Sequence, residues 1–189
     1  MIDLQQMKEE GISEEEWKKT TMAMSNGKVV NFFTGSLVID GQNQPSQSLT
    51  LKRGVARFDL NVDVAGSAAI ESLTLRNVAQ SGYLFAQGEV AASPADVERN
   101  DVTAHFDTAL SASTPGVLYV YEQENAGIEV SIEAVIDGQH KVLTKTLEGN
   151  LKRNTIYTVT VRKNAIDIVV KVDIDDWEPG EDTEIIPQL

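Results

Sequence analysis

The 189-residue sequence contains no cysteine, which excludes disulfide bonds, zinc–thiolate sites and thiol nucleophiles together. Basic residues are scarce, because 16 Lys and Arg stand against 29 Asp and Glu and give a formal net charge of −13. Nucleic acids and anionic bilayers attract proteins through clustered cations, so this charge argues against both as partners. No apolar run approaches the roughly 18 residues that a membrane-spanning helix needs.

The common motifs of catalytic and cofactor sites are also missing. Glycine-rich phosphate-binding loops and the G-x-S-x-G nucleophile elbow do not occur. The two histidines, His105 and His140, fall in a polar stretch and just after a predicted hairpin turn, where exposed imidazoles are the ordinary outcome. Carboxylates are dense in residues 173–184 but lack the spacing of an EF-hand, which leaves a solvated acidic terminus or a weak calcium site as alternatives. These patterns name no catalytic residue and no metal ligand.

What the sequence does contain is a series of segments that alternate apolar and polar residues, the period of half-buried strands. Two segments predict buried faces of three residues each: Phe58, Leu60 and Val62, and Ile168, Val170 and Val172. The Asp137-Gly138 pair predicts a hairpin turn between two further strands. The predicted strands span residues 28–39, 48–51, 55–64, 70–78, 83–85, 117–122, 128–136, 140–147, 155–161 and 166–174.

Helical signals are few. Ser13 followed by Glu16 fits a capping box and predicts a short surface helix, and Ser93-Pro94 predicts a further helical turn. Because strands follow one another without helices between them, the fold class is mostly β, most simply an antiparallel β-sandwich with one or two short helices. The polar stretch 87–116 separates two β-rich halves and is the best candidate for a crossing between two lobes. Periodicity alone leaves one lobe or two open.

Two basic steps lead into strands, at residues 51–58 and 151–157, and chemistry alone predicts turns with exposed Arg and Lys there. These steps belong to an ordered set of motifs: residues 29–35, 51–58, 75–78, 83–85, 118–122 and 153–157, and then Trp177. In this order and spacing the motifs resemble those of the fimbrillin family, the pilus subunits of anaerobic Gram-negative bacteria. One departure is Gln123 after Glu122, where the family usually has Asn.

The resemblance implies two transthyretin-like lobes, an N-terminal one over residues 1–88 and a C-terminal one with an acidic tail over residues 89–189. It also implies that the leader and the first strand of the family precede the helix and are absent from this sequence. It implies export as a lipoprotein precursor, location in fimbriae at the outer membrane, and a structural role in adhesion without enzymatic activity or cofactor. The expected partners are other fimbrial subunits, joined by strand exchange.

The tail holds the candidate residues for that exchange, which share an apolar side chain: Trp177, Ile185, Ile186 and Leu189. An extended segment with such residues could fill the groove of a sheet that lacks an edge strand. The alternative donor is the last predicted strand, residues 166–174. The alternative function is a ligand- or carbohydrate-binding β-sandwich module of a surface lipoprotein.

Overall fold

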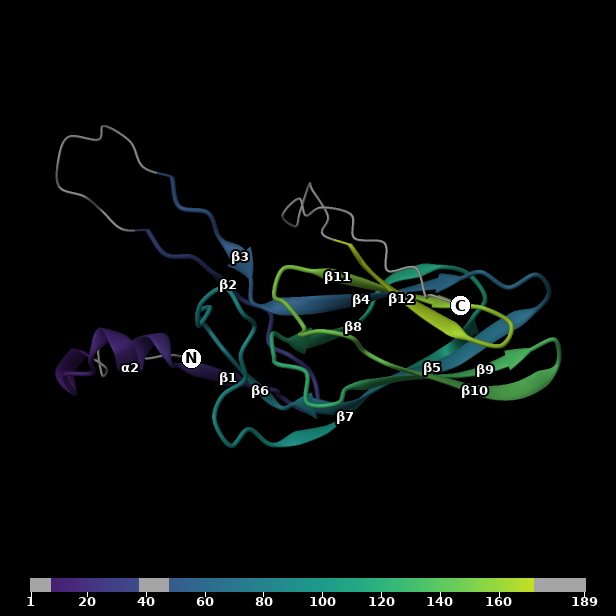
Figure 1. Cartoon of the computed structure of the whole chain (residues 1–189), viewed down its shortest axis with the longest axis horizontal. Coiled ribbons are helices and arrows are strands. Elements are labelled where there is room, and N and C mark those ends of the chain that lie inside the picture. The colour runs from purple at the N-terminus through teal and green to yellow at the C-terminus, as the bar shows by residue number, and fades with distance from the viewer. Residues whose placement is uncertain (1–7, 38–47, 172–189) are drawn as a thin grey trace.

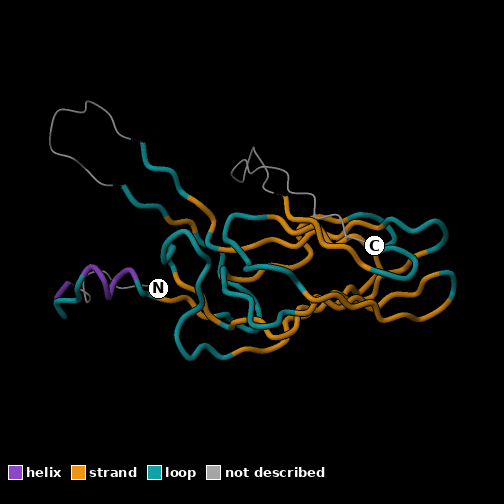
Figure 2. Tube along the Cα trace, in the orientation of Figure 1, coloured by secondary structure: helices purple, strands orange, loops and turns teal. Residues whose placement is uncertain are grey.

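The computed structural model describes residues 8–37 and 48–171, and most of them lie in or between the strands of two β-sheets. One sheet contains β5 (Ala68–Ala79), β7 (Arg99–Leu110), β9 (Glu129–Ile136) and β10 (Gln139–Thr146). The other contains β4 (Val55–Val62), β8 (Thr114–Tyr121), β11 (Ile156–Val161) and β12 (Ile166–Lys171). The sheets lie one above the other along the long axis of the molecule (Figures 1 and 2), which confirms the predicted β-sandwich.

The strand order is β10-β9-β5-β7 in the first sheet and β12-β11-β4-β8 in the second. Neighbouring strands are antiparallel except β4 and β11, which run parallel. Strands β7 and β8 are therefore edge strands of different sheets. They follow each other in the chain and line the same hollow, so they lie on the same side of the sandwich.

The inward side chains of both sheets form one continuous core. Phe58 and Leu60 of β4 are buried as their alternation predicts, and the Phe58 ring stacks on that of Tyr157 in β11, with ring centroids 5.1 Å apart. Val62, at the end of β4, is only half-buried. Burial therefore follows the predicted alternation most closely in the middle of the sheet.

The last strand departs from the predicted burial. Ile168 and Val170 are half-buried instead of buried, because β12 is an edge strand with a neighbour on one side only. Val172, the third residue of that predicted face, lies outside the described residues.

Shorter elements gather at one end of the sandwich (Figure 1). They are helix α2 (Glu14–Lys18), the pair β1 (Thr21–Ala23) with β6 (Ser81–Tyr83), and the pair β2 (Phe33–Thr34) with β3 (Lys52–Arg53). The predicted capping box is confirmed, since the Ser13 hydroxyl accepts from the Glu16 N–H and the Glu16 carboxylate accepts from the Ser13 N–H. No helix in the described part of the chain is long and apolar enough to cross a membrane.

The pairing of the strands crosses the predicted boundary between two lobes, which was placed between residues 88 and 89. Strands β4 and β5 come from the predicted N-terminal lobe, yet β4 pairs with β8 and β11, and β5 pairs with β7 and β9, all from the predicted C-terminal lobe. The strands β4, β5 and β7 to β12 thus build one sandwich. Alternation identifies strands and their buried faces, but it carries no information about which strands become neighbours.

The stretch 87–116 was expected to be poor in strands, and this prediction is wrong. It contains all of the 12-residue strand β7 and the beginning of β8. Ser93-Pro94 begins no helix, and a turn follows at residues 95–96. Conversely, residues 28–39 form far less strand than predicted. Of their described part, only Phe33 and Thr34 lie in a strand.

Candidate functional site

The side of the sandwich between β7 and β8 is open. Each of these strands pairs with one neighbour only, β7 with β5 and β8 with β4, so each has a free edge among the described residues. An unpaired edge presents a row of N–H and C=O groups that can hydrogen-bond to another strand. This side is therefore a candidate site for strand addition.

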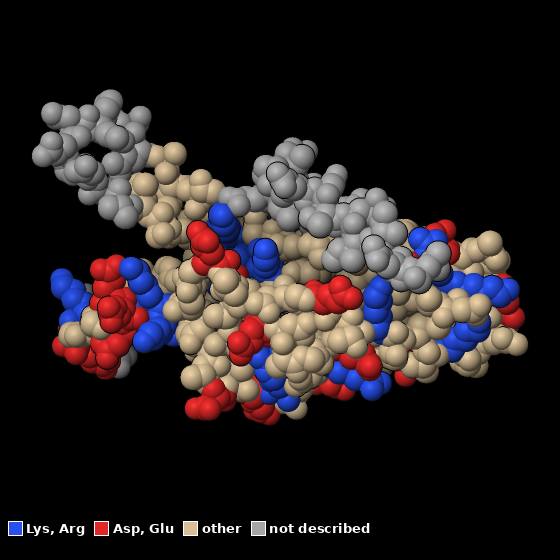
Figure 3. All heavy atoms as spheres, viewed as in Figure 1, with Lys and Arg blue, Asp and Glu red and all other residues tan. Residues whose placement is uncertain are grey.

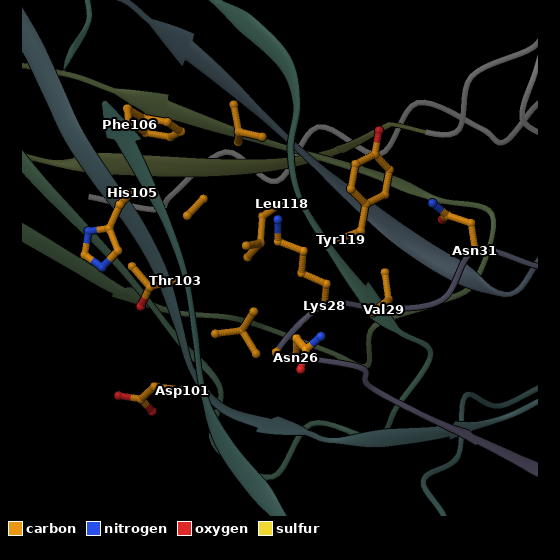
Figure 4. Close-up of a pocket in the computed structure, with 14 residues that line it drawn as sticks. Asn26, Lys28, Val29, Asn31, Asp101, Thr103, His105, Phe106, Leu118 and Tyr119 are labelled. Carbon is orange, nitrogen blue, oxygen red and sulfur yellow. The ribbon is translucent and has the colours of Figure 1, made fainter. Parts of the chain in front are cut away.

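A hollow of about 720 Å³ lies along this open side (Figure 4). Its walls come from β7 (residues 101–106), from β8 (residues 117–119) and from the N-terminal segment (residues 26–29 and 31). Ala104 and Phe106 of β7 are only half-buried although they pack against the core. The hollow thus gives outside access to the apolar space between the sheets, which is where an additional strand would place its inward side chains.

The N-terminal segment lies beside the hollow without joining either sheet. No backbone hydrogen bond links residues 26–31 to β7 or β8 in the part of the chain that the structure describes. The segment is held instead by Tyr121, whose hydroxyl accepts from the Val30 N–H at 2.9 Å and donates to the Ala23 carbonyl at 3.1 Å. Burial raises the pKa of Tyr121, so its hydroxyl keeps the proton that it donates. Both free strand edges remain available beneath this segment.

The opposite side of the sandwich, between β10 and β12, is closed by charged side chains. Lys145 of β10 pairs with Asp167 of β12 at 3.4 Å, and Lys141 donates to the Asn164 side chain at 2.7 Å. By contrast, β8 contains no charged residue, and no ion pair between β7 and β8 occurs among the described residues. Charged side chains on an edge strand oppose the addition of a further strand. On the β7–β8 side, β7 carries Arg99, Asp101 and Asp107, so β8 is the edge strand without charged side chains.

A buried arginine fixes the end of the sandwich next to the open side. The Arg153 side chain is 8% exposed and its Nε donates to the Glu122 carboxylate at 2.7 Å, while Glu122 is 13% exposed. The guanidinium also donates to the Leu84 carbonyl at 2.8 Å, the Tyr83 carbonyl at 2.9 Å and the Thr34 hydroxyl at 3.2 Å. Arg153 therefore joins β2, the residues after β6 and the end of β8. The prediction of an exposed arginine at this step is wrong.

The structure separates the residues that sequence reasoning considered for chemistry. His105 lies exposed on β7 and lines the hollow, whereas His140 lies exposed on β10, at the other edge of the same sheet. Among the described residues no three His, Asp or Glu side chains are placed to hold a metal ion. The assembly candidates Trp177, Ile185, Ile186 and Leu189, and the acidic segment considered for calcium, lie outside the described residues.

Sequence reasoning did not identify the residues of the β7–β8 side, although the sequence contains an alternating pattern that indicates a strand there. Val102, Ala104 and Phe106 alternate with Asp101, Thr103 and His105, which is the pattern of a half-buried strand. The many small and polar residues around this stretch hide the pattern. Their sparse apolar content is the mark of an edge strand whose inward face is not fully covered.

A family model described as a bacterial Ig-like domain matches residues 87–175. No curated protein matches the chain. The structures described next are named as adhesion or fimbrial proteins.

Solved structures similar to the chain include the following three. The tip fimbrial protein Mfa3 from Porphyromonas gingivalis, with C-terminal truncation, is 14% identical with a TM-score of 0.53, and the match covers 90% of this chain and 76% of that protein. A proposed cell adhesion protein from Bacteroides eggerthii is 12% identical with a TM-score of 0.55, covering 84% and 70%. A proposed cell adhesion protein from Bacteroides uniformis is 14% identical with a TM-score of 0.47, covering 70% and 54%.

The chain thus spans about half the length of the Bacteroides uniformis protein. At these identities the similarity shows the fold alone. The chain has the β-sandwich fold found in the Porphyromonas gingivalis and Bacteroides eggerthii proteins, and the resemblance to the fimbrillin family that its motifs indicate is confirmed at the level of the fold.

Proposed function

We propose that this chain is a structural subunit of cell-surface fimbriae that serve adhesion, and that it accepts a strand from a neighbouring subunit on its β7–β8 side. The carrying observation is the difference between the two sides of the sandwich. The β10–β12 side is closed by Lys145 and Asp167, whereas on the β7–β8 side the uncharged strand β8 borders a hollow with both polar and apolar lining. The names of the similar structures support the fimbrial role, and the motif resemblance supports export as an outer-membrane lipoprotein precursor.

The edge of β8 is oriented to receive the incoming strand. The Arg57 N–H donates to Thr155 next to β11, so the backbone groups of the alternate residue Phe58 face β8 and bond to Leu118, its partner in the register. The N–H and C=O groups of Tyr119 consequently point away from β4, toward the free edge. A strand that pairs here would gain main-chain hydrogen bonds and could place alternate side chains against Ala104 and Phe106.

The C-terminal segment of a neighbouring subunit is the proposed donor. Its sequence offers Trp177, Ile185, Ile186 and Leu189 as apolar side chains for the hollow. The alternative donor, β12, is less suitable because its removal would expose Ile166 and the half-buried Ile168 and Val170, at roughly 1.5–3 kcal/mol for each side chain fully exposed. The proposed partners are therefore other fimbrial subunits of the same or a related sequence.

Replacement of Tyr119 by proline tests the acceptor edge. Proline removes the outward N–H and leaves the β4 ladder intact, whereas the matched control Tyr119→Ala removes the same side chain and keeps the N–H. We expect Tyr119→Pro to form no ladder of polymers in native gels, and Tyr119→Ala to assemble. Urea unfolding of both variants checks that they fold. Equal assembly by the two variants would overturn the acceptor assignment.

Deletion of residues 178–189 tests the donor separately. A subunit without its donor should still accept a strand, so it should enter polymers only when mixed with the full chain. The Tyr119→Pro subunit should show the opposite defect, because it donates and does not accept. Unchanged polymer formation by the truncated subunit alone would refute the C-terminal segment as donor and leave β12 as the candidate.

A second candidate function, binding of a carbohydrate or another small ligand, is favoured by the same hollow. Its volume of about 720 Å³ falls in the ordinary range for small-molecule sites, and Asn26, Asn31 and Tyr119 add polar groups and a ring to its wall. A monomer that never polymerises, but whose melting temperature rises with added glycans, would support this function. No shift across a glycan panel would remove it.

A further inference from the structure

Exposed apolar side chains gather on one projection of the molecule. Phe33 is 53% exposed, Leu37 41%, Leu49 50% and Leu51 56%. They lie on two limbs, residues 33–37 and 48–53, here called the ribbon. Figure 1 shows the ribbon leaving the sandwich beyond β2 and β3, and Figure 3 shows that it stands clear of the body. Of the large hydrophobic side chains that are exposed in the described residues, only Val30, Val90 and Val142 lie elsewhere.

The four apolar side chains belong to one face. Phe33 is opposite Arg53, and Thr34 is opposite Lys52. The same register carried outward places Gly35 opposite Leu51 and Leu37 opposite Leu49, and residues directly opposite each other share a face. Gly35 allows the close approach, because a side chain there would meet the Thr50 carbonyl and Leu49. The ribbon is therefore amphipathic.

The apolar face points away from the body. On the polar face, the Thr34 hydroxyl donates to the Leu84 carbonyl and accepts from Arg153, which fixes that face against the sandwich. On the apolar face, the Arg53 guanidinium lies 4.9 Å from the centre of the Phe33 ring, which is a contact within the ribbon. A two-stranded ribbon with a bare apolar face is marginal in water, so a covering segment would stabilise it.

Area and charge select the covering segment. Four half-exposed side chains present on the order of 400 Å², well below the roughly 800 Å² per partner of a stable dimer. A segment of the same chain needs less area, because its effective concentration is high. Arg53 lies on the apolar face and Lys52 on the polar face, and the described residues of the ribbon contain no carboxylate. Residues 172–189 contain seven carboxylates and no Lys or Arg, and they also hold apolar side chains. The segment is therefore opposite in charge to Arg53 and can supply apolar side chains to the same face.

The described chain also ends close to the foot of the ribbon. Lys171 is paired with Ile156, which is paired with Arg57, only four residues beyond Arg53. Two strand spacings and four residues along β4 correspond to about 10 Å and about 13 Å. The 18 residues after Lys171 span up to about 60 Å when extended, so they reach any point of the ribbon.

We propose that in the free subunit the C-terminal segment, residues 172–189, docks on the apolar face of its own ribbon, with its isoleucines and Leu189 against Phe33, Leu49 and Leu51. This contact is intramolecular and does not depend on the proposed strand addition. If both occur, the segment leaves the ribbon when it enters a neighbour.

A spin label tests this contact directly, because the chain has no cysteine of its own. Gln188→Cys is labelled with a nitroxide in isotope-labelled full-length protein, at a concentration where the subunit is monomeric. We expect the amide signals of Leu49, Thr50 and Leu51 to lose most of their intensity. The signal of Val142, an exposed apolar residue on β10, should stay unchanged. Unchanged signal intensities both at the ribbon and at Val142 would overturn the proposal.

Two further samples separate the remaining outcomes. The double variant Leu49→Ser/Leu51→Ser should restore the Thr50 signal, whereas the matched control Val142→Ser should not. If the signal loss persists in the double variant, the apolar face does not hold the segment. Mixing isotope-labelled protein without the nitroxide with spin-labelled protein without the isotope should leave the ribbon signals intact. Signal loss in this mixture would show docking from another copy, and would overturn the intramolecular contact.

Discussion

Removal of the buried arginine should be among the most destabilising single changes in the chain. Arg153→Met keeps much of the apolar length of the side chain and deletes the guanidinium. Glu122, 13% exposed, then loses its cation, and the Tyr83 carbonyl loses its donor. The Leu84 carbonyl loses one of two donors, because the Thr34 hydroxyl still donates to it. The variant therefore leaves one uncompensated carboxylate and one carbonyl without its donor in a nearly buried region.

The expected loss is about 3–5 kcal/mol in the free energy of unfolding, the usual cost of removing one partner of a buried ion pair. Arg162→Met is the matched control. Arg162 also pairs with two carboxylates, Asp63 and Asp167, but its side chain is 53% exposed. Solvent-exposed ion pairs contribute about 0–1 kcal/mol, so the same substitution should cost little there.

Urea unfolding measures both variants, and an unchanged dependence of the free energy on urea would show that the same surface unfolds. The double variant Glu122→Gln/Arg153→Met should lose less than the sum of the two single variants, because neither charge is then left alone. Equal losses for Arg153→Met and Arg162→Met, or strict additivity in the double variant, would refute the buried pair as the cause.

Two further predictions concern the core. Phe58→Ala should lower the free energy of unfolding by about 3–5 kcal/mol. Asp59→Asn should lower it by about 1–2 kcal/mol, because Asp59 accepts from the Gly116 N–H and pairs with Arg57. Urea unfolding compares the two variants, and equal losses would contradict the inward assignment of Phe58. Burial raises the pKa of Tyr157 to about 12, so the folded state retains a proton that the unfolded chain releases near pH 10. The contribution of Tyr157 to the free energy of unfolding should therefore be fully present below about pH 10 and fall as the pH approaches 12. Tyr157→Phe should reduce this alkaline loss, to which Tyr121 also contributes because burial raises its pKa as well. Tyrosinate absorbance should show one late-ionising group fewer in the variant, and an unchanged alkaline profile would contradict this assignment.

The fold class was predictable because it depends on local periodicity. The alternation around Phe58 and Leu60 identifies both a strand and its buried face, and Asp137-Gly138 marks a hairpin that the structure contains between β9 and β10. The neighbours of each strand were not predictable in this way. The parallel pairing of β4 with β11 joins residues about a hundred positions apart, and no local pattern encodes it. This pairing crosses the predicted boundary between the two lobes at residues 88 and 89.

The candidate site was less predictable than the fold for the same reason. Arg153 resembles an exposed turn residue in the sequence, and only the approach of Glu122 and of the carbonyls at residues 83 and 84 makes its burial favourable. The strand β7 is polar on its outer face and small on much of its inner face, which resembles a linker. Only the structure shows that this stretch is an edge strand, with β8 on the same side of the sandwich and both edges free among the described residues.

The contrast between the two sides of the sandwich argues that the open side is selected. Both sides consist of edge strands from different sheets, so both face the same hazard of unwanted pairing. The β10–β12 side is protected by Lys141, Lys145 and Asp167. If the β7–β8 side had no partner, similar protection would be expected along β8, yet that strand carries no charge and borders a hollow with half-buried apolar residues. The contrast belongs to β8, because β7 carries Arg99, Asp101 and Asp107. An uncharged β8 edge beside this hollow supports the proposal that the subunit accepts a strand there and not on the β10–β12 side.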